Sequence, residues 1–163
     1  MRFVTTAAVL AALAVPTIGA AVDAAPTCPS TRPRTDRSLT LIRTEDAAIP
    51  SSPISQAVIS GDHLYVSGFL PLAPHTGELV SEGDVVAQTH AVLDNIKTII
   101  EHAGSDLGKV VKVTLYMKNI DDYGTVNEIY ADFFGTHRPA RSAIAAADIP
   151  LGVLVEIDMI ARL

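Results

Sequence analysis

Two short segments near the C-terminus, Pro139-Ala-Arg-Ser-Ala-Ile144 and Val153-Leu-Val-Glu-Ile157, decide how the chain is interpreted. Both are largely apolar, as buried strands are, yet each contains one ionised side chain, Arg141 in the first and Glu156 in the second. Ionised groups inside buried strands usually need a partner. These segments therefore predict a sheet that carries a site for an anion.

Strand periodicity divides the side chains of the second segment between two faces of the predicted sheet. From Val153 to Ala161, alternation places Val153, Val155, Ile157 and Met159 on one face and Leu154, Glu156, Asp158 and Ile160 on the other. We expect helices to cover the apolar face, and the acidic face to be either wet or packed against another subunit. Partial burial would raise the pKa of Glu156 and let it hold or activate a water; the alternative is a solvated strand face.

Arg141 stands at the start of its predicted strand, just after Pro139. The planar guanidinium fork is suited to bidentate capture of a carboxylate. The alternatives are an arginine at a strand end that points at water, or one in a structural ion pair.

The other elements follow from apolar periodicity and turn residues. Ser81 and Asp84 form a capping signature for a helix that ends at about Gly104, with Gln88 off its apolar face. A second helix is predicted over about 121–134, with Val126, Ile129, Tyr130 and Phe133 inward. Strands are predicted at 39–43, 56–60, 63–67, 110–117, 141–147 and 153–161, the second and third joined by Gly61-Asp62 as a hairpin. The expected fold is α+β, one six-stranded mixed sheet with two helices on one face.

The N-terminal region predicts processing. Residues 1–24 have the charged start, apolar run and small residues of a signal peptide, so we expect a secreted or periplasmic protein without stable membrane insertion. An uncleaved anchor is the lesser alternative. Residues 25–37 predict a flexible tail, and residues 38–163 a single domain. Cys28, the single cysteine, is then free or pairs between chains, and lipidation at this residue is a minor alternative.

Charge and motifs exclude several function classes. The net charge is −6, and it stays −6 without residues 1–24, which argues against nucleic acid as the main partner. The five histidines show no metal-ligand spacing, so no metal site is expected. No phosphate-binding glycine loop and no Gly-x-Ser-x-Gly elbow occurs. Nucleophilic catalysis is therefore disfavoured.

Several motifs follow one another along the chain: Val66-Ser67-Gly68-Phe69-Leu70-Pro71, Pro74-His75-Thr76-Gly77-Glu78, the stretch from Gln88 to Lys97, Thr125-Val126-Asn127, Pro139-Ala140-Arg141-Ser142 and Val155-Glu156-Ile157. In this order they resemble the YjgF/RidA family of reactive-intermediate deaminases. The resemblance runs from about Thr40 to Arg162.

The resemblance implies a chorismate-mutase-like homotrimer with ligand pockets between subunits. It also implies hydrolysis of 2-imino and enamino acids to 2-keto acids and ammonia, without cofactor. Arg141 would clamp the substrate carboxylate and Glu156 would position or activate water. Ser67, Gly68 and Asn127 would line the pocket, and backbone groups near Ala143 would contact the small imino or keto acid.

Two positions depart from the family pattern. Ile54 follows Pro53 where many of these deaminases have tyrosine, and Ala143 stands where they often have cysteine. We therefore expect a more apolar pocket and a shifted substrate range. The rival hypothesis is a non-enzymatic trimer that binds small carboxylates or acts as a holdase-like protein. Nuclease activity, also ascribed to relatives, is a distant third because the body is acidic.

Overall fold

The structure, a computed structural model, describes residues 38–163. The expected signal peptide (1–24) and tail (25–37) lie outside the described residues. The helices are α1 (Val85–His102) and α2 (Tyr123–Phe134). The strands are β1 (Thr40–Ile42), β2 (Ala57–Ser60), β3 (His63–Phe69), β4 (Val110–Met117), β5 (Ala140–Ala145) and β6 (Val155–Arg162). Short 3₁₀ helices are η1 (Leu107–Lys109), η2 (Ile120–Asp122) and η3 (Pro150–Gly152).

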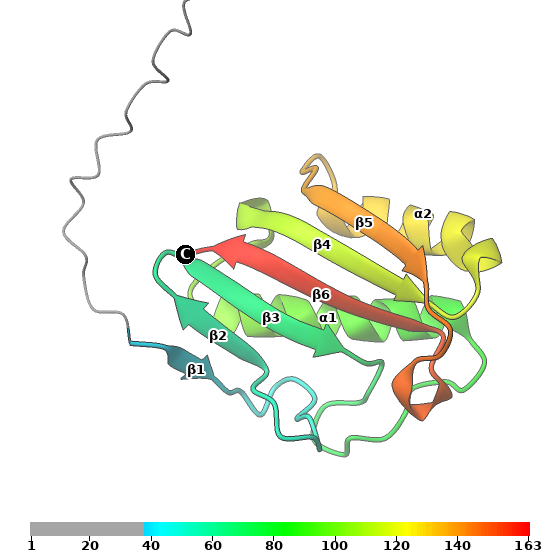
Figure 1. Cartoon of the computed structure of the whole chain (residues 1–163), viewed down its shortest axis with the longest axis horizontal. Helices are drawn as coiled ribbons and strands as arrows, with labels where there is room; N and C mark the ends of the chain where they lie inside the picture. The colour runs from blue at the N-terminus through cyan, green and yellow to red at the C-terminus, as the bar shows by residue number, and fades with distance from the viewer. Residues whose placement is uncertain (1–37) are drawn as a thin grey trace, which may run out of the picture. The chain divides into compact units, whose positions relative to one another are not determined.

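The six strands form one mixed sheet in the order β1-β2-β3-β6-β4-β5. β4 and β5, connected through η2 and α2, are parallel, and the other neighbours are antiparallel. Both helices lie behind the sheet in Figure 1, so they cover one of its faces. The predicted fold, a six-stranded mixed sheet with two helices on one face, is confirmed.

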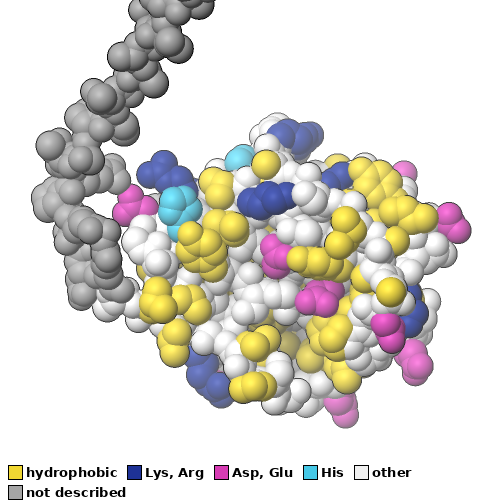
Figure 2. Space-filling model, in the orientation of Figure 1, with side chains coloured by type: hydrophobic (Ala, Val, Ile, Leu, Met, Phe, Trp, Pro, Cys, Tyr) yellow, Lys and Arg dark blue, Asp and Glu magenta, His cyan; other side chains and the backbone are white. Residues whose placement is uncertain are grey.

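The C-terminal strand β6 lies in the middle of this sheet, between β3 and β4. Val155, Ile157, Met159 and Ala161 are completely buried on the helix side. They pack with a row of α1 residues, Val92, Leu93, Ile96, Ile99 and Ile100. Glu156, Asp158 and Ile160 alternate with them and lie on the open face, which is turned toward the viewer in Figure 2. The predicted assignment of faces is therefore confirmed.

The start of α1 corrects two predictions. Asp84, not Ser81, caps the helix: its carboxylate accepts hydrogen bonds from the backbone N–H groups of Val86 (3.0 Å) and Ala87 (3.1 Å). Gln88 is buried rather than off the apolar face, because its Oε1 accepts from Leu154 N (2.8 Å) and its Nε2 donates to Ser81 O (3.2 Å). Helical periodicity cannot reveal a polar side chain whose partners come from distant loops.

Two more buried amides attach the loop after β1 to the body. Gln56 accepts from Thr44 N (2.7 Å) and donates to Thr44 O (2.9 Å) and Ala48 O (3.1 Å). Asn95 accepts from Ala48 N (2.6 Å) and donates to Leu72 O (2.9 Å). These amides satisfy backbone groups that no strand pairs, so the loop can be buried without losing hydrogen bonds.

Replacing Gln56 with leucine should lower the free energy of unfolding by roughly 2–4 kcal/mol, since it leaves Thr44 N–H and three carbonyls without the Gln56 amide. Urea denaturation of the full chain at one protein concentration measures the change. His90→Leu, on the exposed side of α1, is the control and should stay within about 0.5 kcal/mol of wild type. Equal stability of the two variants would contradict this role for the buried amide.

Candidate active site

Arg141 lies on edge strand β5 and faces the helix side of the sheet. Its register partner on β4 is Val113, which is buried in the core. Helix α2 passes over it and presents Tyr123, Asn127 and Tyr130, spaced by four and then three residues, on one face. The parallel β4–α2–β5 unit therefore brings the arginine under the helix.

These three residues hold the guanidinium. The Nη2 of Arg141 donates to Tyr123 Oη (2.8 Å) and to Asn127 Oδ1 (2.7 Å), and the guanidinium carbon lies 4.4 Å from the centroid of the Tyr130 ring. No carboxylate of residues 38–163 lies within ion-pair distance of Arg141. A half-buried, oriented cation with neutral partners is well suited to bind an anion.

The hydroxyl of Tyr130 is buried and has no hydrogen-bond partner among the described residues. Burial raises the pKa of Tyr130, while the charges of Arg141 and Arg138 act in the opposite direction. The phenol therefore stays neutral near pH 7 and offers its ring face to Arg141.

Glu156 lies on the open face, beside a β-bulge in β3. Val66 pairs with Met159 and Phe69 with Ile157, so Ser67 and Gly68 together oppose one residue of β6. A Cβ on Gly68 would overlap Glu156 Oε1 and lie 3.1 Å from its Cδ. Gly68 therefore leaves the space that the carboxylate occupies. The hydroxyl of Ser67 donates to Ser55 O (2.7 Å), which ties the bulge to the preceding loop.

The surroundings of Glu156 favour its protonated form. Burial raises the pKa of Glu156, and the nearby charge of Asp158 raises it further. Asp158 itself accepts a hydrogen bond from Tyr116 Oη (2.8 Å), and this bond, with burial second, raises the pKa of Tyr116. A carboxyl group that titrates closer to neutral pH can both accept and donate a proton during a reaction.

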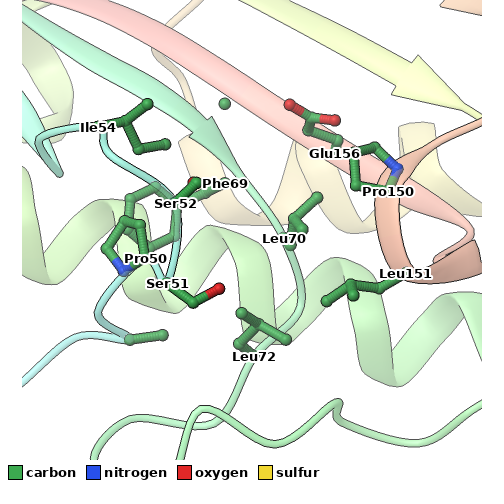
Figure 3. Close-up of a pocket in the computed structure, with 12 residues that line it drawn as sticks. Pro50, Ser51, Ser52, Ile54, Phe69, Leu70, Leu72, Pro150, Leu151 and Glu156 are labelled. Atoms are coloured by element: carbon green, nitrogen blue, oxygen red, sulfur yellow. The ribbon is translucent and has the colours of Figure 1, made fainter.

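A cavity of about 280 Å³ opens beside Glu156. Figure 3 shows Ile54 and Glu156 along its upper border, with Leu70, Leu72 and Leu151 below them. Its lining residues are Ala48, Pro50, Ser51, Ser52, Ile54, Gly68, Phe69, Leu70, Leu72, Pro150, Leu151 and Glu156. Apolar walls with one carboxylate are typical of a pocket for a small molecule with an apolar part.

Arg141 and Glu156 do not meet within one chain. Arg141 of β5 lies level with Val113 of β4, which in turn pairs with Met159 of β6, and all three face the helices. Glu156 of β6 pairs with Tyr116 of β4 on the open face. The two residues are separated by roughly 10 Å along the strands and roughly 10 Å across two strand spacings. One chain therefore presents two half-sites.

The other predicted residues divide between the two half-sites. Asn127 belongs with Arg141, and Ala143, two residues further along β5, is on the same side of the sheet. Ser67 and Gly68 belong with Glu156. The positions of Tyr123 and Tyr130 beside Arg141 were not predicted, although their helical spacing from Asn127 was a usable signal.

Within residues 38–163, no group of three or more His, Cys, Asp or Glu side chains is arranged to hold a metal ion. Within the same residues, no helix is both long and apolar enough to span a bilayer.

The chain is similar to several known proteins along most of its length. Residues 44–163 match the family model described as Endoribonuclease L-PSP. A RutC family protein of Pyrococcus horikoshii is 46% identical over 121 residues, which cover 74% of this chain and 95% of that protein. The 2-iminobutanoate/2-iminopropanoate deaminase of Escherichia coli K12 is 42% identical over 123 residues, which cover 74% of this chain and 94% of that protein.

Solved structures agree with the sequence matches. A putative endoribonuclease from Thermotoga maritima has a TM-score of 0.73 at 44% identity, covering 76% of this chain and 97% of that one. The YjgF gene product of E. coli has a TM-score of 0.70 at 40% identity, covering 76% and 98%. The chain therefore belongs to the Endoribonuclease L-PSP family, and the resemblance of its motifs to the YjgF/RidA proteins is confirmed.

Proposed function

We propose that the protein hydrolyses 2-imino acids and their enamine tautomers to 2-keto acids and ammonia, without a cofactor. The observation that carries this proposal is Arg141, a half-buried cation held by Tyr123, Asn127 and Tyr130 with no carboxylate partner among residues 38–163. An α-carboxylate would supply the missing charge. The deaminase names of the E. coli relative and of a chloroplastic relative from Arabidopsis thaliana support the same reaction.

The site is completed by a second copy of the chain in a homotrimer. A row of side chains crosses the open face of the sheet in register, namely Leu41, Val58, Tyr65 and Ile160. Leu41 and Tyr65 are 65% and 45% exposed in the single chain, which favours burial against another copy. Arg141 on the edge strand of one copy then faces Glu156 of its neighbour across the substrate.

The reaction needs one proton acceptor and a fixed substrate. Arg141 binds the carboxylate, and Glu156 takes a proton from water as the water oxygen attacks C2 of the iminium. Glu156 then gives this proton to the nitrogen of the neutral carbinolamine, the C–N bond breaks, and ammonia leaves. The Glu156 carboxylate takes the hydroxyl proton as the C2 carbonyl forms, and then releases it to solvent, where ammonia is protonated. The raised pKa of Glu156 makes it a stronger base toward the attacking water than an ordinary carboxylate. Positioning supplies most of the rate gain, since imines hydrolyse readily.

We also propose that the protein is exported. The support is the sequence of residues 1–24 alone, with its charged start, apolar run and small residues.

A subunit-mixing assay tests the shared site. Arg141→Ala and Glu156→Gln should each slow the decay of 2-iminobutanoate, made in situ by an amino acid oxidase, by roughly 100-fold or more. Co-expression of the two variants should restore about one quarter of wild-type activity, because each randomly mixed three-fold ring keeps one intact interface.

The control is the doubly substituted chain mixed with Arg141→Ala, which contains no Arg141 and should stay inactive. Mixed variants that remain as inactive as either variant alone would contradict a site shared between copies. A folded wild type that binds keto acids without accelerating imine decay would favour the non-enzymatic binding protein.

The pH dependence should report Glu156. Because its pKa is raised, activity that needs the carboxylate should be lost as the pH falls through a value above the ordinary 4.3 or so for glutamate. Asp158→Asn removes a repelling charge, so the acidic limb should move to lower pH but stay raised, since burial is the larger cause. Carbon NMR titration of the Glu156 carboxyl group measures its pKa independently of turnover. An unchanged or higher pKa of Glu156 in Asp158→Asn would contradict this prediction.

Export is checked by fractionation. The full chain expressed in a bacterial host should be recovered outside the cytoplasm in a shortened form that begins close to residue 25. A variant that lacks residues 2–24 should remain in the cytoplasm. Full-length protein retained in the cytoplasm would argue against export.

A further inference from the structure

The cavity beside Glu156 is more apolar than imine hydrolysis by itself requires. Its apolar lining residues are Ala48, Pro50, Ile54, Phe69, Leu70, Leu72, Pro150 and Leu151. Glu156 is the one charged residue among those that line it. Water activation uses that carboxylate, and the proposed carboxylate clamp, Arg141, is not among the lining residues, so the apolar walls are left without a role.

Leu151 is the clearest outlier in these walls. It is 66% exposed, the most exposed large hydrophobic side chain of residues 38–163. Its backbone lies in the left-handed region (φ 60°, ψ 10°), where a bulky residue is rare and strained. An exposed apolar side chain held in a strained conformation suggests a functional constraint.

Ile54 is a second exposed apolar residue that lines this cavity. Its side chain is 49% exposed in the single chain. It comes from the loop before β2, whereas Leu151 comes from the turn η3 before β6, so two separate loops present apolar groups to one cavity (Figure 3). Buried Phe69 and Ala48 also line the cavity, and half-buried Leu72 lies along its lower border.

The cavity is large enough for a sizeable side chain. An apolar cavity of about 150 Å³ lined by Leu, Ile and Phe holds a benzene ring. The cavity here measures about 280 Å³, so it can take a ring or a branched aliphatic group and still leave space for C2 and a water beside Glu156. A methyl group alone would leave most of the walls in contact with water.

We propose that this cavity receives the side chain of the substrate, with Ile54 and Leu151 as specificity-determining residues, and that the preferred substrates are 2-imino acids with branched aliphatic or aromatic side chains. The proposal rests on the deaminase function above, because it takes Glu156 as the group at the reacting carbon. The substrate carboxylate points toward Arg141 of the neighbouring copy, and the side chain extends the other way. An acidic side chain is disfavoured because it would meet Glu156.

Equilibrium binding of product keto acids tests the pocket without depending on turnover. Calorimetry on the wild-type protein would compare pyruvate, 4-methyl-2-oxopentanoate and 2-oxoglutarate. The branched acid should bind at least roughly 10-fold more tightly than pyruvate, since a single added methylene in a matched apolar pocket already contributes about that factor. 2-Oxoglutarate should bind more weakly than the branched acid.

Variants identify the wall that selects the side chain. Leu151→Ala keeps the strained backbone and removes the side chain, so it should weaken binding of the branched acid several-fold and leave pyruvate unchanged. Leu151→Gly should lose the same selectivity while its unfolding temperature rises, because glycine accepts a positive φ. Val86→Ala, at an exposed position on α1 outside the cavity, is the matched control. It should change neither the binding of the branched acid nor the binding of pyruvate.

Turnover then separates the two proposals. With imines made in situ, kcat/KM should be higher for 2-imino-4-methylpentanoate than for 2-iminopropanoate, and Leu151→Ala should raise KM for the branched substrate alone. Fast turnover with equal binding of the two keto acids, or equal loss for both in Leu151→Ala, would overturn the pocket assignment and leave the deaminase. Selective binding of the branched acid without turnover would overturn the deaminase and support the pocket.

Discussion

The alternation of buried and open side chains along β6 sets the two faces of the whole sheet. This strand is hydrogen-bonded on both sides, to β3 and to β4, and its buried residues Val155, Ile157 and Met159 form the middle of the core. A slip of one residue would bury Glu156 and Asp158 and expose the apolar set. Both helices cover the same face, so the register of β6 decides which face of the whole sheet stays open.

The division of the sheet into a covered and an open face separates the polar groups of the candidate site. Arg141 lies on the covered face of the edge strand under α2, and Glu156 lies on the open face near the middle of the sheet. The guanidinium has neutral partners within residues 38–163, and the carboxyl group is held close to another acid. The arginine half-site is therefore electrostatically incomplete within one chain, and in the proposed homotrimer the carboxylate of the substrate would supply the missing charge.

Local irregularities in the backbone position the groups of the candidate site. The β-bulge at Ser67 and Gly68 leaves the volume that the Glu156 carboxylate occupies, while the bond from Tyr116 to Asp158 fixes the neighbouring charge. The left-handed turn at Leu151 brings an apolar side chain to the same cavity. Regular sheet geometry gives the faces, and these departures from it shape the pocket.

Period-two and helical patterns report local burial directly, so the sequence alone predicts the elements, their order and the two faces of β6. The same patterns single out Arg141 and Glu156 as candidates, and their role stays a prediction. The folded chain alone reveals that these two residues lie on opposite faces, that Tyr123 and Tyr130 hold the arginine, and that Gln88 is buried. Each of these depends on which distant strand or loop lies next to a residue. Contacts of that kind follow from strand order and chain crossing, which leave no periodic signal in the chain.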